Sequence, residues 1–348
     1  MADSLKPEDA NSQAQTSIRY RKVSQWPLSQ EEALIRDFRK SDLDGILDLL
    51  PKCFAEEFEV SGFDSDHIRD MVNRAFGLGG RILLAPSRLF GTLPFRFLVA
   101  VRGDELVGST MVSGAGKAGY ISSVMVAPDL RRRGLATKLV TTAVEYIQGR
   151  GEERAVLHVV TTNMPAIGVY SKLGFEEFER VARLVASLDS EPSEEPTSNV
   201  VIRPYRSGDL EEVYNLHMVS EDPSHIAVFG FDRKELKTPL WLRLFRFVTR
   251  ARIVAVRGGS IIGSVEVQYS SPKEAGHISS LLVRAEDRSG SVEKALAAAA
   301  MREIWKGGVR KVVAQVPATR PELNDTMQAL GYKEAKVLAG MSRALGGR

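Results

Sequence analysis

Residues Val124–Ala136 read VMVAPDLRRRGLA. The first three residues are apolar and two of them are β-branched, so they predict a short strand that ends before Pro128. A turn follows, and apolar side chains then recur at helical spacing, which predicts a helix over 137–147. The apolar positions of that helix are Leu139, Val140, Ala143, Val144 and Ile147. The order of strand, turn and helix start directs free backbone N–H groups toward an anion.

The composition of this turn favours a diphosphate as the anion. Gly134 and Ala136 are small, so a phosphate can approach the backbone closely. Three arginines add positive charge, namely Arg131, Arg132 and Arg133. The turn is not a Walker loop, because no Gly-Lys-Ser/Thr follows. It is not a dinucleotide fingerprint either, because one glycine stands where that motif has two or three.

A second block of sequence follows within forty residues. Gly151 ends the helix, and 155–160 is a short apolar run that predicts a buried strand. The residues Thr162–Phe175 then read TNMPAIGVYSKLGF. In this block Asn163 is a predicted helix N-cap, Pro165 suits an early helical position, and Gly174 is a predicted C-terminal stop. The second block therefore predicts a short helix directly after the strand.

Together the two blocks resemble the GNAT family of N-acetyltransferases. Arg131-x-x-Gly134-x-Ala136 is similar to that family's acetyl-CoA pyrophosphate loop. The block from Asn163 to Phe175 is similar to its Asn-x-x-Ala-x-x-x-Tyr-x-x-x-Gly-Phe pattern. The resemblance implies an α/β (α+β) fold with a mixed, mostly antiparallel sheet flanked by helices. It also implies acetyl-CoA as co-substrate and no metal, and no Cys/His cluster with metal-ligand spacing occurs in the sequence.

The resemblance further implies which residues bind acetyl-CoA. The strand that contains Val124, Met125 and Val126 should splay from the strand at 155–160 and bind pantetheine and the thioester carbonyl through its main chain. The diphosphate would be held by the turn and helix start at Leu130–Thr137. After Leu130, the residues expected to bind it are Arg131, Arg132, Arg133, Gly134, Leu135, Ala136 and Thr137. Asn163 stands where family members often contact cofactor or substrate, and its helix-capping role is compatible with that contact.

Two catalytic roles are expected from the resemblance. Tyr170 would be the general acid, since a phenol is a competent proton donor to a departing thiolate; otherwise its ring belongs to the core. His158 is one candidate for the base, because imidazole can take a proton from an ammonium near neutrality. Ribosomal-protein N-terminal acetyltransferases often carry glutamate at this strand position. The alternative base is a water molecule relayed by Ser123 or Tyr120. In that case His158 would have a structural role in the sheet.

The chain also repeats itself, which predicts two domains. IRDFRKSDL at 35–43 returns as IRPYRSGDL at 202–210, and LVAVRG at 98–103 returns as IVAVRG at 253–258. Between the halves lies an acidic segment rich in Ser and Pro, which is typical of a linker. We predict a disordered tail at 1–17, a catalytic N-terminal GNAT domain at 18–188, a linker at 189–199 and a degenerate GNAT-like domain at 200–348. Each of the two tandem domains is expected to have its own mixed, mostly antiparallel sheet flanked by helices.

The second copy is predicted to have lost the chemistry. If Gly290 aligns with Gly134, then Asp287 replaces Arg131 and Val292 replaces Ala136. An acidic residue would repel a diphosphate, and valine would crowd it. Farther along, Asn163 maps to Arg320 and Tyr170 maps to Met327, which cannot act as an acid. A loosely aligned but active second domain is the alternative.

Composition limits the other classes of function. The formal net charge of +3 is too small to favour a nucleic-acid partner. The single cysteine, Cys53, excludes an intrachain disulfide. No signal peptide is evident, and the most apolar window, 82–101, contains two arginines and two prolines. We expect a cytoplasmic protein, a monomer or homodimer, without integral membrane association.

The sequence thus predicts an acetyl-CoA-dependent N-acetyltransferase whose acceptor is a primary amine, either a small molecule or a peptide N-terminus. The C-terminal copy would be structural or would shape the acceptor site. A catalytically idle acyl-CoA-binding sensor or interaction module is the alternative. The sequence does not identify the acceptor, because the matched motifs concern the CoA part of the reaction and a fold does not fix a substrate.

Overall fold

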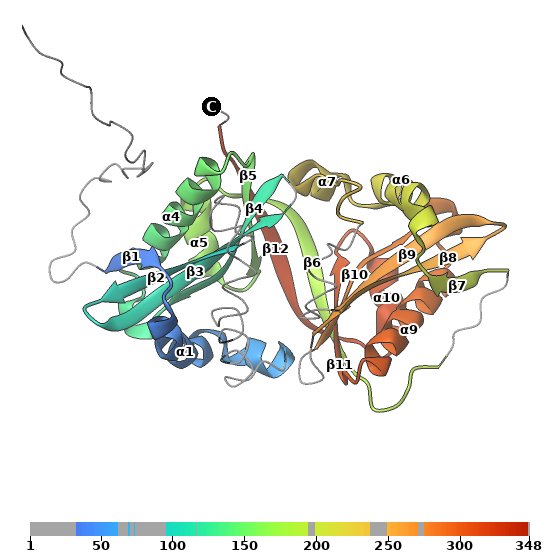
Figure 1. Ribbon diagram of the computed structural model, residues 1–348, viewed down its shortest axis with the longest axis horizontal. Coiled ribbons are helices and arrows are strands. Elements are labelled where there is room, and N and C mark those ends of the chain that lie inside the picture. Colours follow the sequence, from blue (N-terminus) through green and yellow to red (C-terminus); the bar gives the residue numbers. More distant parts are fainter. Residues whose placement is uncertain are drawn as a thin grey trace, which may run out of the picture. The chain divides into compact units, whose positions relative to one another are not determined.

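The repeat in the sequence is present in the structure as two runs of elements in the same order (Figure 1). The computed structural model describes residues 33–61, 69, 73, 95–115, 117–193, 199–236, 249–270 and 275–346. The predicted tail at 1–17 and residues 194–198 of the predicted linker lie outside the described residues.

The first run contains β1 (Leu34–Asp37), η1 (Lys40–Asp42), α1 (Leu43–Ser61), β2 (Phe95–Arg102), β3 (Glu105–Ala115), β4 (Ala118–Val126), η2 (Pro128–Leu130), α4 (Leu135–Gly149), β5 (Arg154–Val160), α5 (Met164–Lys172) and β6 (Glu176–Ser187). The second run contains β7 (Val201–Pro204), η3 (Ser207–Asp209), α6 (Leu210–Ser220), α7 (Pro223–Phe229), β8 (Thr249–Arg257), β9 (Ser260–Tyr269), β10 (Gly276–Val283), η4 (Ala285–Asp287), α9 (Ser291–Lys306), β11 (Lys311–Pro317), α10 (Pro321–Ala329) and β12 (Lys333–Ala344). The predicted order of strands and helices is confirmed.

The repeated nonapeptide forms the same ionic clamp in both halves. Asp42 accepts hydrogen bonds from both terminal nitrogens of Arg36, at 2.6 and 2.8 Å, and from the Arg39 backbone N–H at 2.6 Å. In the second half, Asp209 accepts the equivalent bonds from Arg203 at 2.7 and 2.9 Å. Each clamp fixes the turn from the first strand into the following helix, because a bidentate Arg–carboxylate pair restricts both groups to one geometry.

The predicted helix after the arginine turn is confirmed and is somewhat longer than 137–147. It is α4, and its predicted apolar stripe is buried. This stripe packs against the strands of the first half, and α9 packs in the same way in the second half. Helices thus cover the sheet by burying one apolar stripe each, which is the main stabilising term for such elements.

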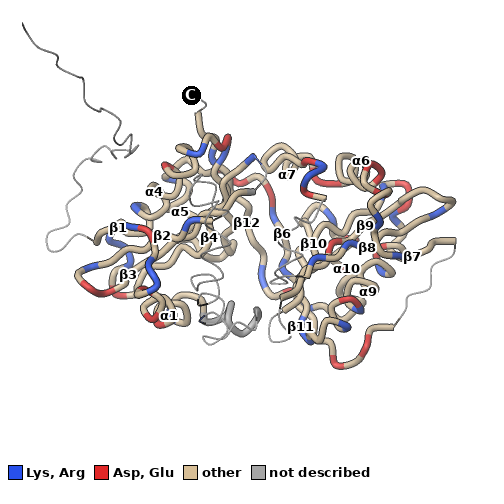
Figure 2. The backbone as a smooth tube through the Cα atoms, viewed as in Figure 1, with Lys and Arg blue, Asp and Glu red and all other residues tan. Residues whose placement is uncertain are grey.

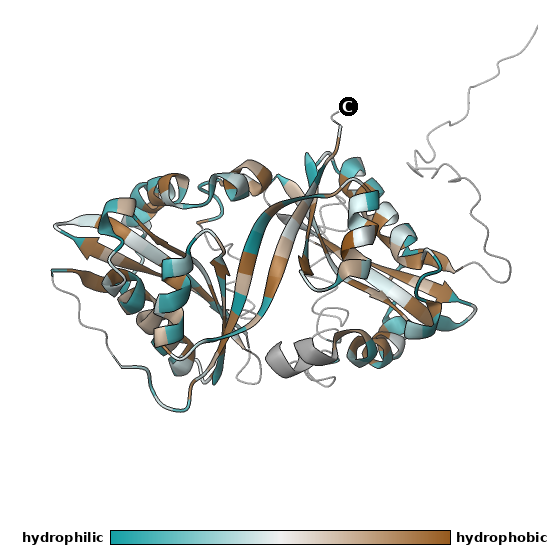
Figure 3. Cartoon of the chain, turned by 180° about the vertical axis from the view of Figure 1, so that it is seen from behind, coloured by the Kyte–Doolittle hydropathy of each residue, from teal (hydrophilic) through white to brown (hydrophobic). Residues whose placement is uncertain are grey.

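Within the described residues, twelve strands join in one mixed sheet, in the order β1-β2-β3-β4-β5-β12-β6-β11-β10-β9-β8-β7. The last strand of each half is exchanged with the other half. β12 pairs antiparallel with β5, although it follows β11 in sequence, and β6 pairs antiparallel with β11, although it follows β5. β6 and β12 also pair with each other, so they lie side by side in the middle of the sheet (Figures 1 and 3).

The exchange differs from the sequence-based expectation that each half carries its own sheet. Strand periodicity indicates which residues are extended and which face is apolar, but it does not select the neighbouring strand. The fifth strand of either half has an open edge that accepts an antiparallel strand, and here the strand from the other half fills it. Each half therefore completes the sheet of the other.

A buried carboxylate also connects the halves beside the exchanged strands. Glu179 on β6 has a side chain only 9% exposed. Its Oε1 lies 2.9 Å from Nε2 of His158 on β5, and its Oε2 lies 3.0 Å from Nδ1 of His225 on α7. Burial by itself raises the pKa of Glu179, but the hydrogen bonds from His158 and His225 outweigh that effect and lower the pKa to about 2.

The exchange predicts that the halves stay together when the chain is cut between them. We would insert a protease site between Ser193 and Asn199, cleave the folded protein and measure the elution volume by gel filtration. Co-elution in native buffer is expected, because β12 is paired on both sides by strands of the first half. Elution as two separate species would contradict the exchanged pairing. The uncut insertion variant is the control.

The low pKa of Glu179 predicts a specific pH dependence of stability. Because the pKa of Glu179 in the folded chain lies below the ordinary value of 4.5, the ionised carboxylate stabilises the fold fully above pH 4.5. This stabilisation is lost as the pH falls toward 2. It is on the order of 3 kcal/mol, from 1.36 kcal/mol per pKa unit.

We expect Glu179→Gln to flatten the fall of the unfolding free energy between pH 4.5 and 2, measured by urea denaturation. Glu177→Gln is the control, because Glu177 lies on the same strand with a side chain 41% exposed and pairs with exposed Arg180. If wild type and Glu179→Gln have the same pH slope, Glu179 does not stabilise the folded chain as a carboxylate.

Candidate functional site

The predicted splay between β4 and β5 is confirmed. The two strands pair in parallel only at their beginnings, where Ala118 to Tyr120 face Arg154 to Val156, although β4 continues to Val126. The register with β3 shifts beyond that point, and Ser123 has a positive φ of 51°. A bulge of this kind bends its strand. The main chain of β4 after Tyr120 therefore faces a gap and not a paired neighbour on the β5 side.

The arginine turn lies at the far end of the gap, directly after β4. Gly134 is the N-cap of α4 in the left-handed conformation, with φ of 83°, and a Cβ there would meet no atom within 4 Å. No side chain caps the first N–H groups of α4. Arg131 donates from Nε to the Val126 carbonyl at 3.3 Å, which holds the turn against the end of β4. The helix start therefore presents open N–H groups and empty space to an anion.

One cavity of about 1610 Å³ connects the gap and the turn. It brings together all but one of the residues that the sequence singled out. They are Val124, Met125, Val126, Arg131, Arg132, Gly134, Leu135, Ala136, Thr137, His158, Asn163 and Tyr170. Arg133 is not among the residues that line this cavity. Asn163 also caps α5 as predicted, since its Oδ1 accepts from the Ala166 N–H at 3.2 Å.

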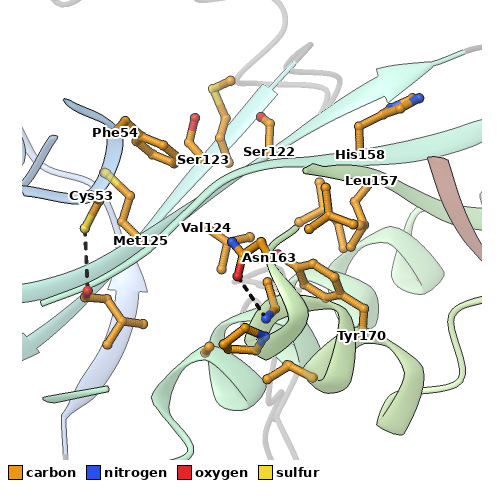
Figure 4. Close-up of a pocket in the computed structure, with 18 of the residues that line it drawn as sticks. Cys53, Phe54, Ser122, Ser123, Val124, Met125, Leu157, His158, Asn163 and Tyr170 are labelled. Carbon is orange, nitrogen blue, oxygen red and sulfur yellow. Dashed lines mark hydrogen bonds between the residues drawn. The ribbon is translucent and has the colours of Figure 1, made fainter. Parts of the chain in front are cut away.

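The two candidate catalytic residues lie on opposite sides of the sheet. Tyr170 on α5 packs in the same core cluster as Leu157. His158, the next residue along β5, belongs to the other face and contacts Tyr120 and Phe178. Figure 4 shows His158 and Tyr170 on opposite sides of the β4 and β5 ribbons. A molecule that passes through the gap can therefore reach Tyr170 on one face of the sheet and His158 on the other.

Tyr170 is buried, with an exposed fraction of 7%. Burial raises the pKa of its phenol to about 12, so the hydroxyl is protonated at neutral pH. Its ring also packs edge-on against Phe175, with ring centroids 6.1 Å apart. The core role and the acid role expected for Tyr170 are thus compatible, because the same residue lines the cavity.

The structure joins the candidate base His158 to Tyr120, which the sequence offered as a relay for a water molecule. The Tyr120 hydroxyl lies 3.0 Å from Nδ1 of His158, and both residues line the cavity. Burial raises the pKa of Tyr120 to about 12, with smaller opposing effects from Arg183 and Glu179. Tyr120 is therefore a neutral hydroxyl that can pass a proton to His158.

Three residues at this site were not found from the sequence, namely Glu179, His225 and Gly340. Glu179 follows His158 by 21 positions, and the other two belong to the second half. No spacing signal connects them with His158, because the exchanged strands bring them together. Only the repeat itself indicated that the second half would pack nearby.

The second copy has the same backbone course but a different chemistry. Gly290 is the N-cap of α9 with a positive φ, as Gly134 is for α4. The buried carboxylate of Glu293 accepts from the Gly290 N–H at 3.0 Å, so an internal anion occupies this helix start. Val292 is fully buried. These features oppose a bound diphosphate in the second copy.

One expected correspondence between the copies is wrong. Arg288 donates from Nε to the Val283 carbonyl at 3.1 Å, just as Arg131 does to Val126, so Arg288 and not Asp287 is the counterpart of Arg131. The turn of the second copy is one residue shorter between its arginine and its glycine, which shifts the alignment. The correspondence of Tyr170 with Met327 is confirmed. The backbone carbonyl of Tyr170 accepts from the Phe175 N–H, and that of Met327 accepts from the Tyr332 N–H, five residues later in both copies.

The described part of the chain has neither a membrane-spanning helix nor a cluster of metal ligands. None of the helices there is long and apolar enough to cross a membrane. No group of three or more His, Cys, Asp and Glu side chains there could hold a metal ion. Figure 2 shows basic and acidic residues spread over both halves of the backbone.

Comparison with known proteins agrees with this geometry. Residues 45–175 match the family model of the acetyltransferase (GNAT) family. The mycothiol acetyltransferase of Streptomyces bingchenggensis is 35% identical over 88 residues, which cover 25% of this chain and 29% of that protein. N-alpha-acetyltransferase 30 of Schizosaccharomyces pombe is 29% identical over 90 residues, which cover 24% of this chain and 60% of that protein. The chain thus spans less than two thirds of the length of either relative.

Two solved structures share the architecture of nearly the whole chain. A GCN5-related N-acetyltransferase from Sphaerobacter thermophilus superposes with a TM-score of 0.63 and 17% identity, covering 91% of this chain and 97% of that chain. A tandem GNAT protein from the clavulanic acid biosynthesis pathway superposes with a TM-score of 0.61 and 16% identity, covering 91% of this chain and 100% of that chain. Residues 45–175 thus match the GNAT acetyltransferase model, and the chain as a whole has the tandem GNAT fold of these solved structures.

Proposed function

We propose that this protein is an acetyl-CoA-dependent N-acetyltransferase that acts on a primary amine. The catalytic half is residues 18–188, and the half at 200–348 is structural or shapes the acceptor site. The observation that carries the proposal is the gap between β4 and β5, which has an open helix start at one end and Tyr170 and His158 on its two faces. Acetyltransferase names among the curated relatives support the reaction class.

The residues of the turn fit the diphosphate of acetyl-CoA. The empty space at Gly134 and the uncapped N–H groups of α4 suit a phosphate that must approach the backbone. Arg131 and Arg132 line the cavity there and add positive charge. The main chain of Val124, Met125 and Val126 would hold the pantetheine arm and polarise the carbonyl. When bound, acetyl-CoA supplies a thioester carbonyl as the electrophile.

Tyr170 and His158 have separate tasks in this proposal. An acceptor ammonium must lose one proton before its nitrogen can attack, and His158 takes that proton across the Tyr120 hydroxyl. The N–C bond then forms and the C–S bond breaks. The leaving sulfur takes the proton of Tyr170, and the second proton of the amine restores the phenol. The amine becomes an amide, and one proton is released overall.

The acceptor is proposed only as a class. A small molecule or a peptide N-terminus with a primary amine fits a base that lies on the face opposite Tyr170. A defined panel of spermidine, glucosamine and a tetrapeptide with a free N-terminus samples that class, with release of the CoA thiol as the readout. If the protein binds acetyl-CoA and transfers acetyl to none of these, the alternative of an idle acyl-CoA-binding module gains support.

Gly134→Glu should abolish acetyl-CoA binding, measured by calorimetry. The change places bulk and negative charge at the open helix start, and wild type is expected to bind one acetyl-CoA per chain. Gly290→Glu is the matched control, because Gly290 has the same N-cap position and also has a positive φ. Both changes carry the same backbone strain of about 1–2 kcal/mol. Binding of two acetyl-CoA molecules per wild-type chain would show that the second copy also binds the ligand. Absence of any acetyl-CoA binding by wild type would contradict the acetyltransferase proposal.

Tyr170→Phe should lower kcat by about 10²-fold or more, the usual contribution of a general acid. The dissociation constant of acetyl-CoA should change little, because the ring remains. Since the pKa of Tyr170 is raised to about 12, the wild-type rate should show no decline from this group below about pH 10. Tyr332→Phe is the control, since it removes another buried phenol hydroxyl from the second half. Equal kcat values for wild type and Tyr170→Phe would exclude Tyr170 as the acid.

A further inference from the structure

We infer that the second half completes the base of the first: Glu179 positions His158 as a proton acceptor, while Gly340 and His225 from the second half allow and hold that contact. The inference rests on the proposed acetyl transfer and deepens it. It gives the second half a defined part in the site, beyond a general structural role. His158 would touch the reacting proton through Tyr120, whereas Glu179, His225 and Gly340 would act as positioning residues.

The contacts form a continuous path from the cavity to the second half. The Tyr120 hydroxyl lies 3.0 Å from Nδ1 of His158, and Nε2 of His158 lies 2.9 Å from Oε1 of Glu179. The other oxygen of Glu179 lies 3.0 Å from Nδ1 of His225. The side chains are 15% exposed for His158, 9% for Glu179 and 38% for His225. Exposure to solvent thus increases at the end of the path that belongs to the second half.

The direction of the path follows from the chemistry of a carboxylate. Because the pKa of Glu179 is lowered to about 2, the group is ionised and can only accept hydrogen bonds. Nε2 of His158 must therefore carry the hydrogen, which leaves the lone pair of Nδ1 facing the Tyr120 hydroxyl. This is the tautomer that can take a proton from the cavity. A histidine held this way by a carboxylate also gains a counter-charge when it becomes imidazolium.

Gly340 explains how His158 and Glu179 can meet although a strand separates them. The exchanged strand β12 runs between β5 and β6, and Gly340 is paired with His158 on one side and with Glu179 on the other. A Cβ at Gly340 would lie 2.6 Å from Cγ of Glu179 and 3.1 Å from Nε2 of His158. The hydrogen bond crosses β12 at this position because no side chain is present there.

Other charged groups face the two ends of the path. At the cavity end, Arg183 and Glu179 act on Tyr120 in opposite directions. At the far end, burial lowers the pKa of His225, but its hydrogen bond to Glu179 and the charges of Glu179, Glu221 and Asp222 outweigh burial and raise it. A protonated His225 would keep Glu179 ionised. The second half thus supports the charge state that His158 needs.

The proton balance of the path is simple. The ammonium proton moves to the Tyr120 oxygen while the Tyr120 hydroxyl proton moves to Nδ1 of His158. His158 becomes imidazolium beside the Glu179 carboxylate, the ammonium becomes a neutral amine, and no other protein group changes its charge. Release of that proton to water after the reaction restores the neutral imidazole. No oxidant, metal or further reactant is needed.

The test is the pH dependence of kcat/KM in the full chain, with the most reactive amine among spermidine, glucosamine and the tetrapeptide. Glu179→Gln should lower kcat/KM at pH 7 by about 10- to 100-fold, a part of the 10²–10⁴ that a general base contributes. The acidic limb should move to lower pH, because the imidazolium loses its counter-charge. Acetyl-CoA binding should be unchanged, since Glu179 does not line the cavity.

Gly340→Ala should reproduce this effect without changing a titratable group, because its Cβ displaces Glu179 from His158. Gly149→Ala is its control, since a Cβ there meets no atom within 4 Å. His225→Ala should reduce the rate by about 3- to 10-fold, and His225→Gln should retain most of it through an amide N–H donor to Glu179. Glu177→Gln again serves as the control for a carboxylate on β6.

The outcomes separate this inference from the proposed function. If wild type acetylates none of the amines, the proposed function fails. If wild type is active and the folded Glu179→Gln and Gly340→Ala variants keep the wild-type rate and acidic limb, the positioning role is overturned. Imidazole ¹⁵N spectra of His158 in wild type test it without any variant. A neutral form with hydrogen on Nε2 supports it, and hydrogen on Nδ1 overturns it.

Discussion

The exchange of the last strands is the constraint on which the rest of this structure depends. Strand β12 closes the open edge of β5, and β6 closes the open edge of β11. Unpaired strand edges leave backbone hydrogen bonds unmade and favour association. Each half therefore supplies what the other lacks, and the twelve described strands form a single sheet. The two halves are thus structurally interdependent.

The same exchange shapes the site. Because β12 pairs with β5 along its length, β5 is held on one side and is released from β4 on the other after Val156. The gap thus lies between a strand fixed by the second half and a strand bent by its own bulge at Ser123. Tyr170 and His158, the proposed acid and base, face opposite sides of this gap, which would separate the departure of the thiol from the deprotonation of the amine in space.

The two copies show how one backbone supports different roles. Both have a glycine N-cap with a positive φ, and both have an arginine that donates to the end of the preceding strand. The first copy leaves its helix start open, whereas the second places Glu293 there. The second copy has Met327 where the first has Tyr170. The turn geometry was retained while the electrostatics were reversed, since the fold depends on the backbone and ligand binding depends on a few side chains.

The sequence by itself determined the resemblance of residues 124–175 to GNAT motifs, the order of elements, the repeat and the stretches that meet at the cavity. These features depend on local signals: helical periodicity in 137–147, the glycine turn at Gly134, and the Asn163 cap. Only the tertiary structure decided which strands are neighbours and that Arg288 is the counterpart of Arg131. It alone joined His158 to Glu179 across Gly340, because contacts between strands distant in sequence depend on the packing of the whole chain and leave no periodic signal.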